Sequence, residues 1–183
     1  SVLEALPDLA SLLNNTQLKS EALGRRAINA ASRLGTPETL AWLIKFAQSD
    51  DISLALKVEA IDALSHWAEP SLLDRVDGRY RGPQKRDLEL LKDHLKPMMA
   101  RMDIENEIKV KVALICMFAE VGEDSASQKI LELLHNNKDA QVRATALLAL
   151  GQLNYKQLDQ VVIRGMTDKS SIVRTEAIGL LAQ

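Results

Sequence analysis

The side chains best suited to chemistry in this 183-residue chain are three histidines, one cysteine and a few acidic residues. A metal centre needs several such ligands at short, regular spacings. His66, His94 and His135 lie far apart in the sequence, and none of them precedes a glutamate. We therefore expect no metal site. His66 is expected to be a packing or hydrogen-bonding residue at a helix end.

The lone cysteine, Cys116, stands within an apolar helical run, where a buried and unreactive thiol is the expected state. No Cys-x-x-Cys-His motif is present to hold a covalent haem. Asp74-x-x-Asp77-Gly78 supplies only part of the ligand pattern of a calcium loop. Phosphate-binding glycine loops and nucleophile elbows are absent too. The sequence thus predicts no catalytic, cofactor-binding or metal-binding residue in this chain, and no enzyme activity.

Basic residues are concentrated between Pro70 and Asp87, together with two glycines and two prolines. This composition is typical of an ordered surface loop or of a segment that docks a partner. The simpler interpretation is a solvated loop whose arginines pair with Asp74, Asp77 and Asp87. The alternative is a docking surface, whose candidate residues are Arg75, Arg79, Tyr80, Arg81 and Arg86. A third interpretation is phosphate or nucleic-acid binding, although Tyr80 is the only aromatic side chain there available for stacking.

The elements that must position these residues are helices. Apolar residues make up 46% of the chain and aromatic residues only 3%, and the abundance of Leu and Ala favours helices over strands. A stripe of small and apolar residues at residues 142–153 recurs in part 31 residues later, and residues 110–122 fit the same frame. Residues 23–35 and 56–67 match each other at a spacing of 33. Between the second and third copies the spacing grows to 54, which implies an insertion of about 21 residues.

A second helix is expected after most copies, because one amphipathic helix cannot bury its apolar stripe alone. Thr36 and Pro37 have the residue types of an N-cap and a first helical position. Residues 125–128 have capping-box spacing. A third partner helix is expected over residues 155–166, with Met166 facing inward. Helix should resume near Arg86, and Pro97 should kink this helix or break it in two.

The sequence Asp139-x-x-Val142-Arg143, placed before an Ala- and Leu-rich helix, resembles HEAT repeats. The resemblance implies an all-α, right-handed α-α superhelix of helix pairs. It would form a single array over residues 1–183, with residues 69–86 as an inserted loop. Asp139 should cap its helix, and Arg143 and Arg174 should make ladder contacts between successive repeats. A row of arginines that binds anions is the alternative.

A narrower resemblance rests on Trp67-Ala68-Glu69-Pro70-Ser71 and on the spacing of residues 74–81. These residues are similar to the HEAT segment of bacterial multidomain membrane-bound dehydrogenases. In those chains the array joins a sorbosone- or glucose-dehydrogenase-like β-propeller to a haem c domain. The resemblance implies a periplasmic or cell-envelope location and redox chemistry in neighbouring domains. Because the helical pattern continues to the last residues, we also expect this chain to be a piece of a longer one.

Net charge and hydropathy limit the classes of partner that this chain can bind. The formal net charge is −2, so there is no global positive field to attract nucleic acid. No apolar run approaches the ~18–20 residues of a membrane-spanning helix. We expect a non-catalytic scaffold or connector whose partner is a protein, either a neighbouring domain or another chain. The alternatives are a HEAT-like DNA glycosylase, which would need a basic groove and stacking tryptophans, and a short-HEAT cofactor lyase.

Overall fold

The computed structural model describes residues 4–14, 18 and 20–182. These residues form helices and connecting segments, and the only β-type pairing among them is an isolated bridge between Leu73 and Tyr80. The chain divides into two compact units, Ser1–Asp103 and Ile104–Gln183. The all-α repeat fold expected from the sequence is confirmed.

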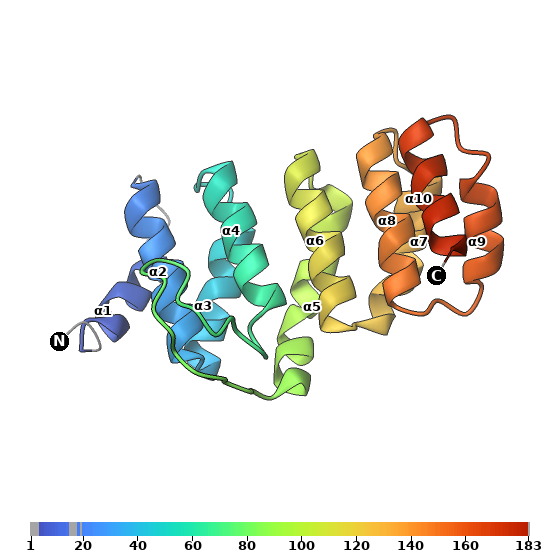
Figure 1. Cartoon of the computed structure of the whole chain (residues 1–183). Coiled ribbons are helices and arrows are strands. Elements are labelled where there is room, and N and C mark those ends of the chain that lie inside the picture. The colour runs from blue at the N-terminus through green and yellow to red at the C-terminus, as the bar shows by residue number, and fades with distance from the viewer. Residues whose placement is uncertain (1–3, 15–17, 19, 183) are drawn as a thin grey trace. The chain divides into compact units, whose positions relative to one another are not determined.

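The first unit is built from five α-helices (Figure 1). Among them α2 packs against α1, α3 and α4, and α3 also packs against α4. The ranges are α1 Leu6–Ser11, α2 Glu21–Leu34, α3 Pro37–Gln48, α4 Leu54–Ser65 and α5 Leu88–Ile104, and a 3₁₀ helix, Leu12–Asn14, follows α1. The last residue of α5 belongs to the second unit.

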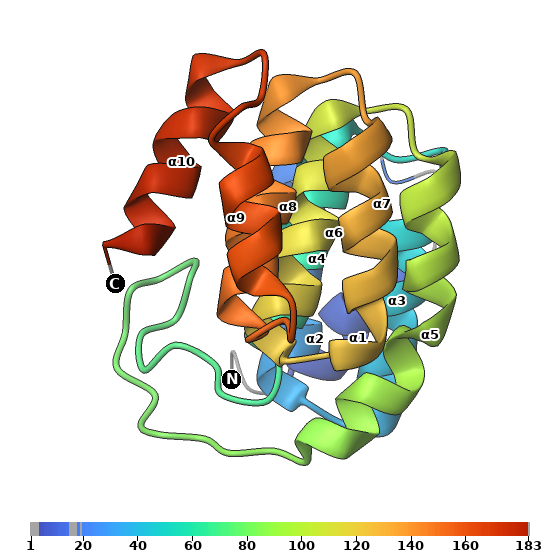
Figure 2. The ribbon, with the colours of Figure 1, turned by 90° about the vertical axis from the view of Figure 1, so that its right-hand side faces the viewer.

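The second unit contains α6 Ile108–Val121, α7 Ser127–Asn136, α8 Ala140–Gln152, α9 Leu158–Gly165 and α10 Ser171–Leu181, with a 3₁₀ helix at Asp124–Ala126. Helix α8 is central in it and packs against α6, α7, α9 and α10 (Figure 2). Most stripe residues of the repeat are buried, including Leu64 in the first unit and Leu150 in the second, whereas Leu181 in the last copy is 55% exposed. The pattern that defined the repeat is therefore the pattern of the core.

Helix ends follow the expected chemistry at several positions. Thr36 caps α3 through a reciprocal pair of hydrogen bonds with Thr39, and Pro37 is the first helical residue. Asp139 caps α8 by accepting from the backbone N–H groups of Gln141 and Val142, at 2.8 and 3.1 Å. These caps satisfy amide groups that the helix itself leaves without partners.

Two helix details differ from expectation, and the break that was one of two expectations at Pro97 does not form. Ser125 lies in a 3₁₀ helix that Glu123 caps, so it does not cap α7, and residue Ala126 at the N-cap offers no side-chain bond. Met166 follows the last turn of α9 and is 39% exposed, because Val161, Val162 and Gly165 already fill the inward face. Helix α5 runs through Pro97 without being divided.

The Arg ladder forms in part. Arg143 of α8 donates to both carboxylate oxygens of Asp168, in the connection before α10, at 2.9 and 2.8 Å. It also donates to the carbonyls of Asn137 and Lys138. Arg174 makes the equivalent bonds to the carbonyls of Asp168 and Lys169. One arginine thus joins two successive repeats, while the other holds the connection that precedes its own helix.

Candidate functional site

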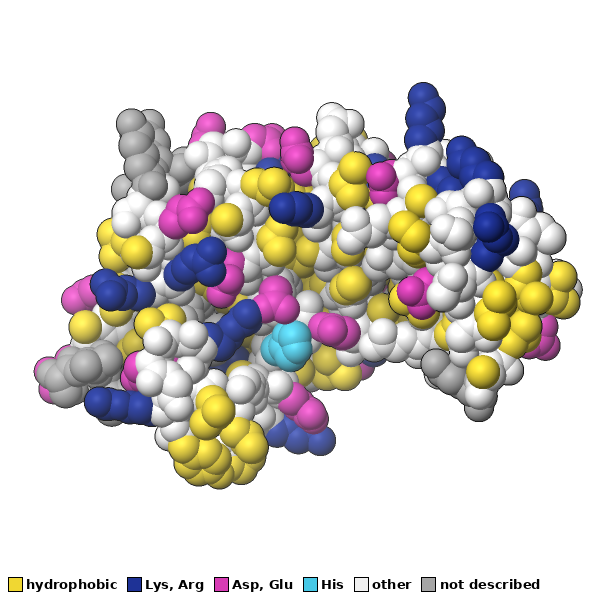
Figure 3. All heavy atoms as spheres, turned by 45° about the horizontal axis from the view of Figure 1, so that its top comes forward, with side chains coloured by type: hydrophobic (Ala, Val, Ile, Leu, Met, Phe, Trp, Pro, Cys, Tyr) yellow, Lys and Arg dark blue, Asp and Glu magenta, His cyan; other side chains and the backbone are white. Residues whose placement is uncertain are grey.

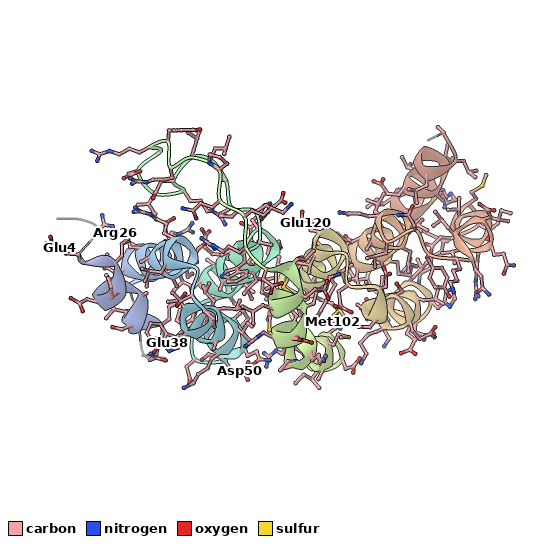
Figure 4. The ribbon with its side chains drawn as sticks, turned by 90° about the horizontal axis from the view of Figure 1, so that it is seen from below. Glu4, Arg26, Glu38, Asp50, Met102 and Glu120 are labelled. Atoms are coloured by element: carbon pink, nitrogen blue, oxygen red, sulfur yellow. The ribbon has the colours of Figure 1, made fainter. Side chains whose placement is uncertain are left out.

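The segment between α4 and α5, residues 66–87, contains all five candidate residues. It runs from α4 back across α2 before returning to α5 (Figure 1). Seen from below, it lies on one side of α2 and α4, and α3 lies on the other (Figure 4). A tight turn organises it: the Asp74 N–H donates to the Arg79 carbonyl at 2.8 Å, and the Arg81 N–H donates to the Leu72 carbonyl at 2.7 Å. Gly78 closes the turn with a φ of 68°, which glycine adopts without strain.

Asp74 fixes this turn to the helices. Its carboxylate is 1% exposed and accepts hydrogen bonds from the backbone N–H groups of Val76 and Asp77 at 2.9 and 3.0 Å. It also accepts from Asn29 of α2 at 3.1 Å and lies 3.3 Å from the guanidinium of Arg33. Burial alone would disfavour the charged carboxylate, but these donors outweigh it and lower the pKa of Asp74 from its ordinary value of 3.8. Asp74 therefore stays charged and acts as a fastening point.

Arg86 makes the second set of contacts that hold the segment against the helices. Its guanidinium lies 5.2 Å from the centre of the Trp67 ring and donates to the carbonyls of Trp67 and Arg33 at 3.0 and 3.4 Å. Burial lowers the pKa of Arg86 from its ordinary value. The guanidinium fits beside the end of α2 because Gly35 has no side chain there. A Cβ at this position would overlap the Arg86 guanidinium. Arg86 is thus half-buried, and its guanidinium is held by contacts within the protein.

The other four candidates lie at the surface of the segment. Arg75 pairs with Asp62 and lies 3.8 Å from Glu59, both on α4. Arg81 pairs with Asp74 and with Asp77, the latter at 2.6 Å. The side chain of Arg79 is 74% exposed, and Tyr80 is 68% exposed. Two arginines therefore hold the segment in place, and Arg79 and Tyr80 remain available for contact.

A groove of about 690 Å³ lies between this segment and helices α1, α2 and α4. Its walls combine apolar side chains with charged ones, and three of the candidate residues line it. The lining residues are Leu6, Asn29, Ser32, Arg33, Asp62, Ala63, His66, Pro70, Ser71, Leu73, Asp74, Arg75, Tyr80, Arg81 and Gln84. Arg79 and Arg86 do not line it. A groove of this size accommodates a few side chains of a bound polypeptide.

The outer edge of the segment carries exposed apolar side chains. Leu72, Leu73 and Val76 are 49%, 54% and 49% exposed, and Tyr80 lies across the bridge from Leu73. Figure 3 shows hydrophobic side chains gathered at this edge, at the lower left of the view. A cluster of apolar side chains on a charged loop is unusual for a surface that contacts only water.

His66 and Trp67 have structural surroundings in the described part of the chain. No group of three or more His, Cys, Asp or Glu side chains there could hold a metal ion. His66 ends α4 with its Nδ1 3.0 Å from the Asp62 carbonyl, as expected for a hydrogen-bonding residue. Trp67 is 1% exposed and so cannot stack on a nucleic-acid base. None of the described helices is long and apolar enough to cross a membrane.

The prediction for Cys116 is wrong, because its side chain is exposed. On α6 the neighbours Leu114, Ile115, Met117 and Phe118 all face inward, which leaves position 116 on the outer side of the helix. Desolvation by adjacent atoms and the charge of Glu120 both raise the pKa of the thiol. A raised pKa favours the protonated thiol, so low reactivity remains the expectation for Cys116.

Sequence reasoning missed Asn29 and Arg33 as parts of this site. Both lie on α2, more than 40 residues before Asp74, and neither belongs to a motif. No signal in the sequence pointed to these two residues. The simpler expectation was that the charged residues of the loop pair with one another. Asp77 and Arg81 do so, but Asp74 also makes long-range contacts with α2.

Comparison with known proteins agrees with this architecture. Residues 95–182 match the family described as HEAT repeats. A designed armadillo repeat protein solved in complex with the peptide (KR)4 is 17% identical with a TM-score of 0.58, and the match covers 98% of this chain and 81% of that one. A second designed armadillo repeat protein is 14% identical with a TM-score of 0.53, covering 98% and 84%.

An engineered protein is 16% identical with a TM-score of 0.55, and the match covers 98% of this chain and 49% of that one. Comparison with curated proteins gave no match. At such identities the structures show the fold alone, while the family match covers the second unit and the end of α5. The chain has the fold of helical repeat proteins of the HEAT and armadillo type.

Proposed function

We propose that this protein is a non-catalytic interaction scaffold, and that residues 66–87 with the groove beneath them bind a partner polypeptide. The observation that carries the proposal is that the segment is held against the helices while apolar side chains on it stay exposed. Asp74 and Arg86 hold it rigidly against α2, while Leu72, Val76 and Tyr80 remain exposed on its outer edge. A preorganised surface loses less conformational entropy on binding than a mobile loop does.

The partner polypeptide fits the chemistry of the groove. Apolar side chains such as Leu6 and Pro70 line it together with Arg33, Arg75 and Arg81. Such a mixture suits a peptide segment that inserts an apolar side chain and hydrogen-bonds through its backbone. Peptide binding by one of the designed armadillo proteins supports the same use of a helical repeat surface.

We further propose that the partner is a neighbouring domain in a larger bacterial dehydrogenase with a haem c domain. The support is the sequence resemblance at residues 67–71 and 74–81, which lie in this same segment. If the parent chain is such an enzyme, the scaffold contributes domain placement and no redox chemistry. Co-purification of this chain with separately expressed propeller and haem domains tests this narrower proposal.

The test of the general proposal is a selection of 12-residue peptides displayed on phage against the immobilised protein. We expect selected peptides to bind at least ~10-fold more weakly to the Val76→Asp and Tyr80→Ala variants, since truncating one hot-spot contact costs about 1–2 kcal/mol or more. The matched control is Leu54→Asp, because Leu54 is 36% exposed at the other end of α4. Equal losses in all three variants, or none in any, would reject the proposal. Circular dichroism checks that each variant is folded.

A further inference from the structure

A concentration of unneutralised cations occupies one end of the second unit. The α7–α8 and α9–α10 connections lie there, with Lys138 and Lys169 exposed on them. Arg164 of α9 is exposed nearby, and Arg174 of α10 is half-buried. Figure 3 shows Lys and Arg side chains gathered over this part of α8–α10, at the upper right of the view.

The acidic residues Asp139 and Asp168 at this end already have hydrogen-bond partners within the protein. Asp139 caps α8, and Asp168 binds Arg143 through both oxygens and also accepts from the Ser170 N–H at 2.7 Å. The hydrogen bond from Arg143 lowers the pKa of Asp168, so this pair is charged and internally neutral. Arg143 is therefore used within the protein, and an anion-binding row of arginines at the repeat position does not form there.

The remaining cations have no carboxylate partner among the residues that the structure describes. Lys138, Arg164 and Lys169 form no ion pair, and Arg174 donates only to the carbonyls of Asp168 and Lys169. His135 lies beside them, and burial together with the charge of Arg164 lowers the pKa of its ring. Burial is the larger of these two causes, and only the effect of Arg164 reflects a positive charge near the ring.

The same end is hollowed. Two adjoining hollows of about 190 and 320 Å³ share His135 and Asp168 as lining residues. Arg164 and Thr167 line the first, and Lys138 and Lys169 line the second. Cations that surround a concave surface act together on one bound group, whereas scattered surface lysines do not.

We infer that these hollows form a second docking surface, which binds an acidic segment of a partner polypeptide. Carboxylates of Asp or Glu would lie between Lys138, Lys169 and Arg164, which form no ion pair among the described residues. No Phe, Tyr or Trp side chain lines either hollow, so the rings on which single-stranded nucleic acid stacks most strongly are missing there. The surface lies in the other unit from residues 66–87, and the inference stands independently of the proposed function.

The experiment measures binding of a rhodamine-labelled hexaglutamate peptide to the whole chain by fluorescence anisotropy in low salt. Lys169→Glu is compared with Lys156→Glu, which makes the same charge change at an exposed position in the connection at the other end of α8 and α9. We expect Lys169→Glu to weaken binding roughly tenfold or more, because a like charge replaces a complementary one. Lys156→Glu should change it less than about twofold.

Three results would overturn the inference. The first is no measurable binding of hexaglutamate, and the second is an equal loss in both variants, which would show attraction to overall charge alone. The third is tighter binding of a thymidine dodecanucleotide than of hexaglutamate, which would assign the surface to nucleic acid. Lys138→Ala repeats the comparison with a milder change and checks that the effect does not depend on introducing a carboxylate.

Discussion

The carboxylate of Asp74 lies 3.3 Å from the guanidinium of Arg33, and this contact joins the 66–87 segment to α2. The two side chains are 1% and 16% exposed, so water screens them weakly. Asn29, one helical turn before Arg33, donates to the same carboxylate at 3.1 Å. A long connection between two repeats is thereby held as part of the first unit.

Replacing Asp74 should destabilise the first unit strongly. Asp74→Ala leaves Arg33 and two backbone amides without their acceptor, and we expect a loss of about 3 kcal/mol in the free energy of unfolding. Asp77→Ala removes a more exposed partner of Arg81 and should cost under ~1 kcal/mol. Urea denaturation followed by circular dichroism measures both variants. Similar losses would mean that Asp74 is not the main fastening point.

Acid should weaken the protein through the same group. The pKa of Asp74 is lower in the folded protein than its ordinary value of 3.8. Its stabilisation is therefore present above pH 3.8 and is lost as the pH falls through the lower, folded value. Asp168, whose pKa is also lowered, acts in the same direction in the second unit. Urea midpoints measured from pH 7 down to about 2 should fall less steeply for Asp74→Asn than for the wild type; parallel curves would contradict this assignment.

Replacing Arg86 should destabilise the protein more than replacing Arg79, although both belong to the same basic segment. Arg86→Ala removes the contact with Trp67 and two bonds to carbonyls, and we expect a loss of about 2 kcal/mol. Arg86→Lys should lose a similar amount of stability, because an ammonium group cannot stack on the Trp67 ring and donate to two carbonyls as the planar guanidinium does. Arg79→Ala should cost under ~0.5 kcal/mol. Thermal melts and tryptophan fluorescence follow the changes, and equal losses for Arg79 and Arg86 would refute the distinction.

Gly35 should tolerate no side chain. Its φ of 60° and the 2.2 Å approach of Arg86 to a Cβ built there both oppose substitution. We expect Gly35→Ala to cost more than about 1 kcal/mol. Gly179→Ala on α10 is the matched control, because nothing lies within 4 Å of its Cβ position. Alanine favours a helix interior, so this second variant should melt at the same temperature or higher.

The repeat core should be sensitive to truncation on one face of α8 only. Leu150→Ala removes a fully buried side chain and should cost ~2–5 kcal/mol. Leu148→Ala changes a residue on the same helix that is 40% exposed, and it should cost under ~1 kcal/mol. Guanidinium unfolding curves for the two variants make the comparison. Equal destabilisation would show that the inward stripe of α8 is assigned incorrectly.

The sequence by itself determined the helices and their inward faces. Apolar periodicity specifies which stripe a helix must bury, and local capping chemistry specifies where it begins, as Thr36 and Asp139 show. Both are properties of neighbouring residues along the chain. For this reason the repeat frame and the buried positions Leu64 and Leu150 could be predicted without any structure.

Only the tertiary structure decided what lies against the remaining faces. Cys116 stands in an apolar run yet is exposed, because it lies on the outer side of α6. Arg86 resembled the other loop arginines in sequence, but Gly35 and Trp67 give it a buried place. Asp74 found its partners on a helix far back in the chain. Such contacts depend on which surfaces meet after the repeats stack, and periodicity along one helix holds no information about the residues that approach it from elsewhere.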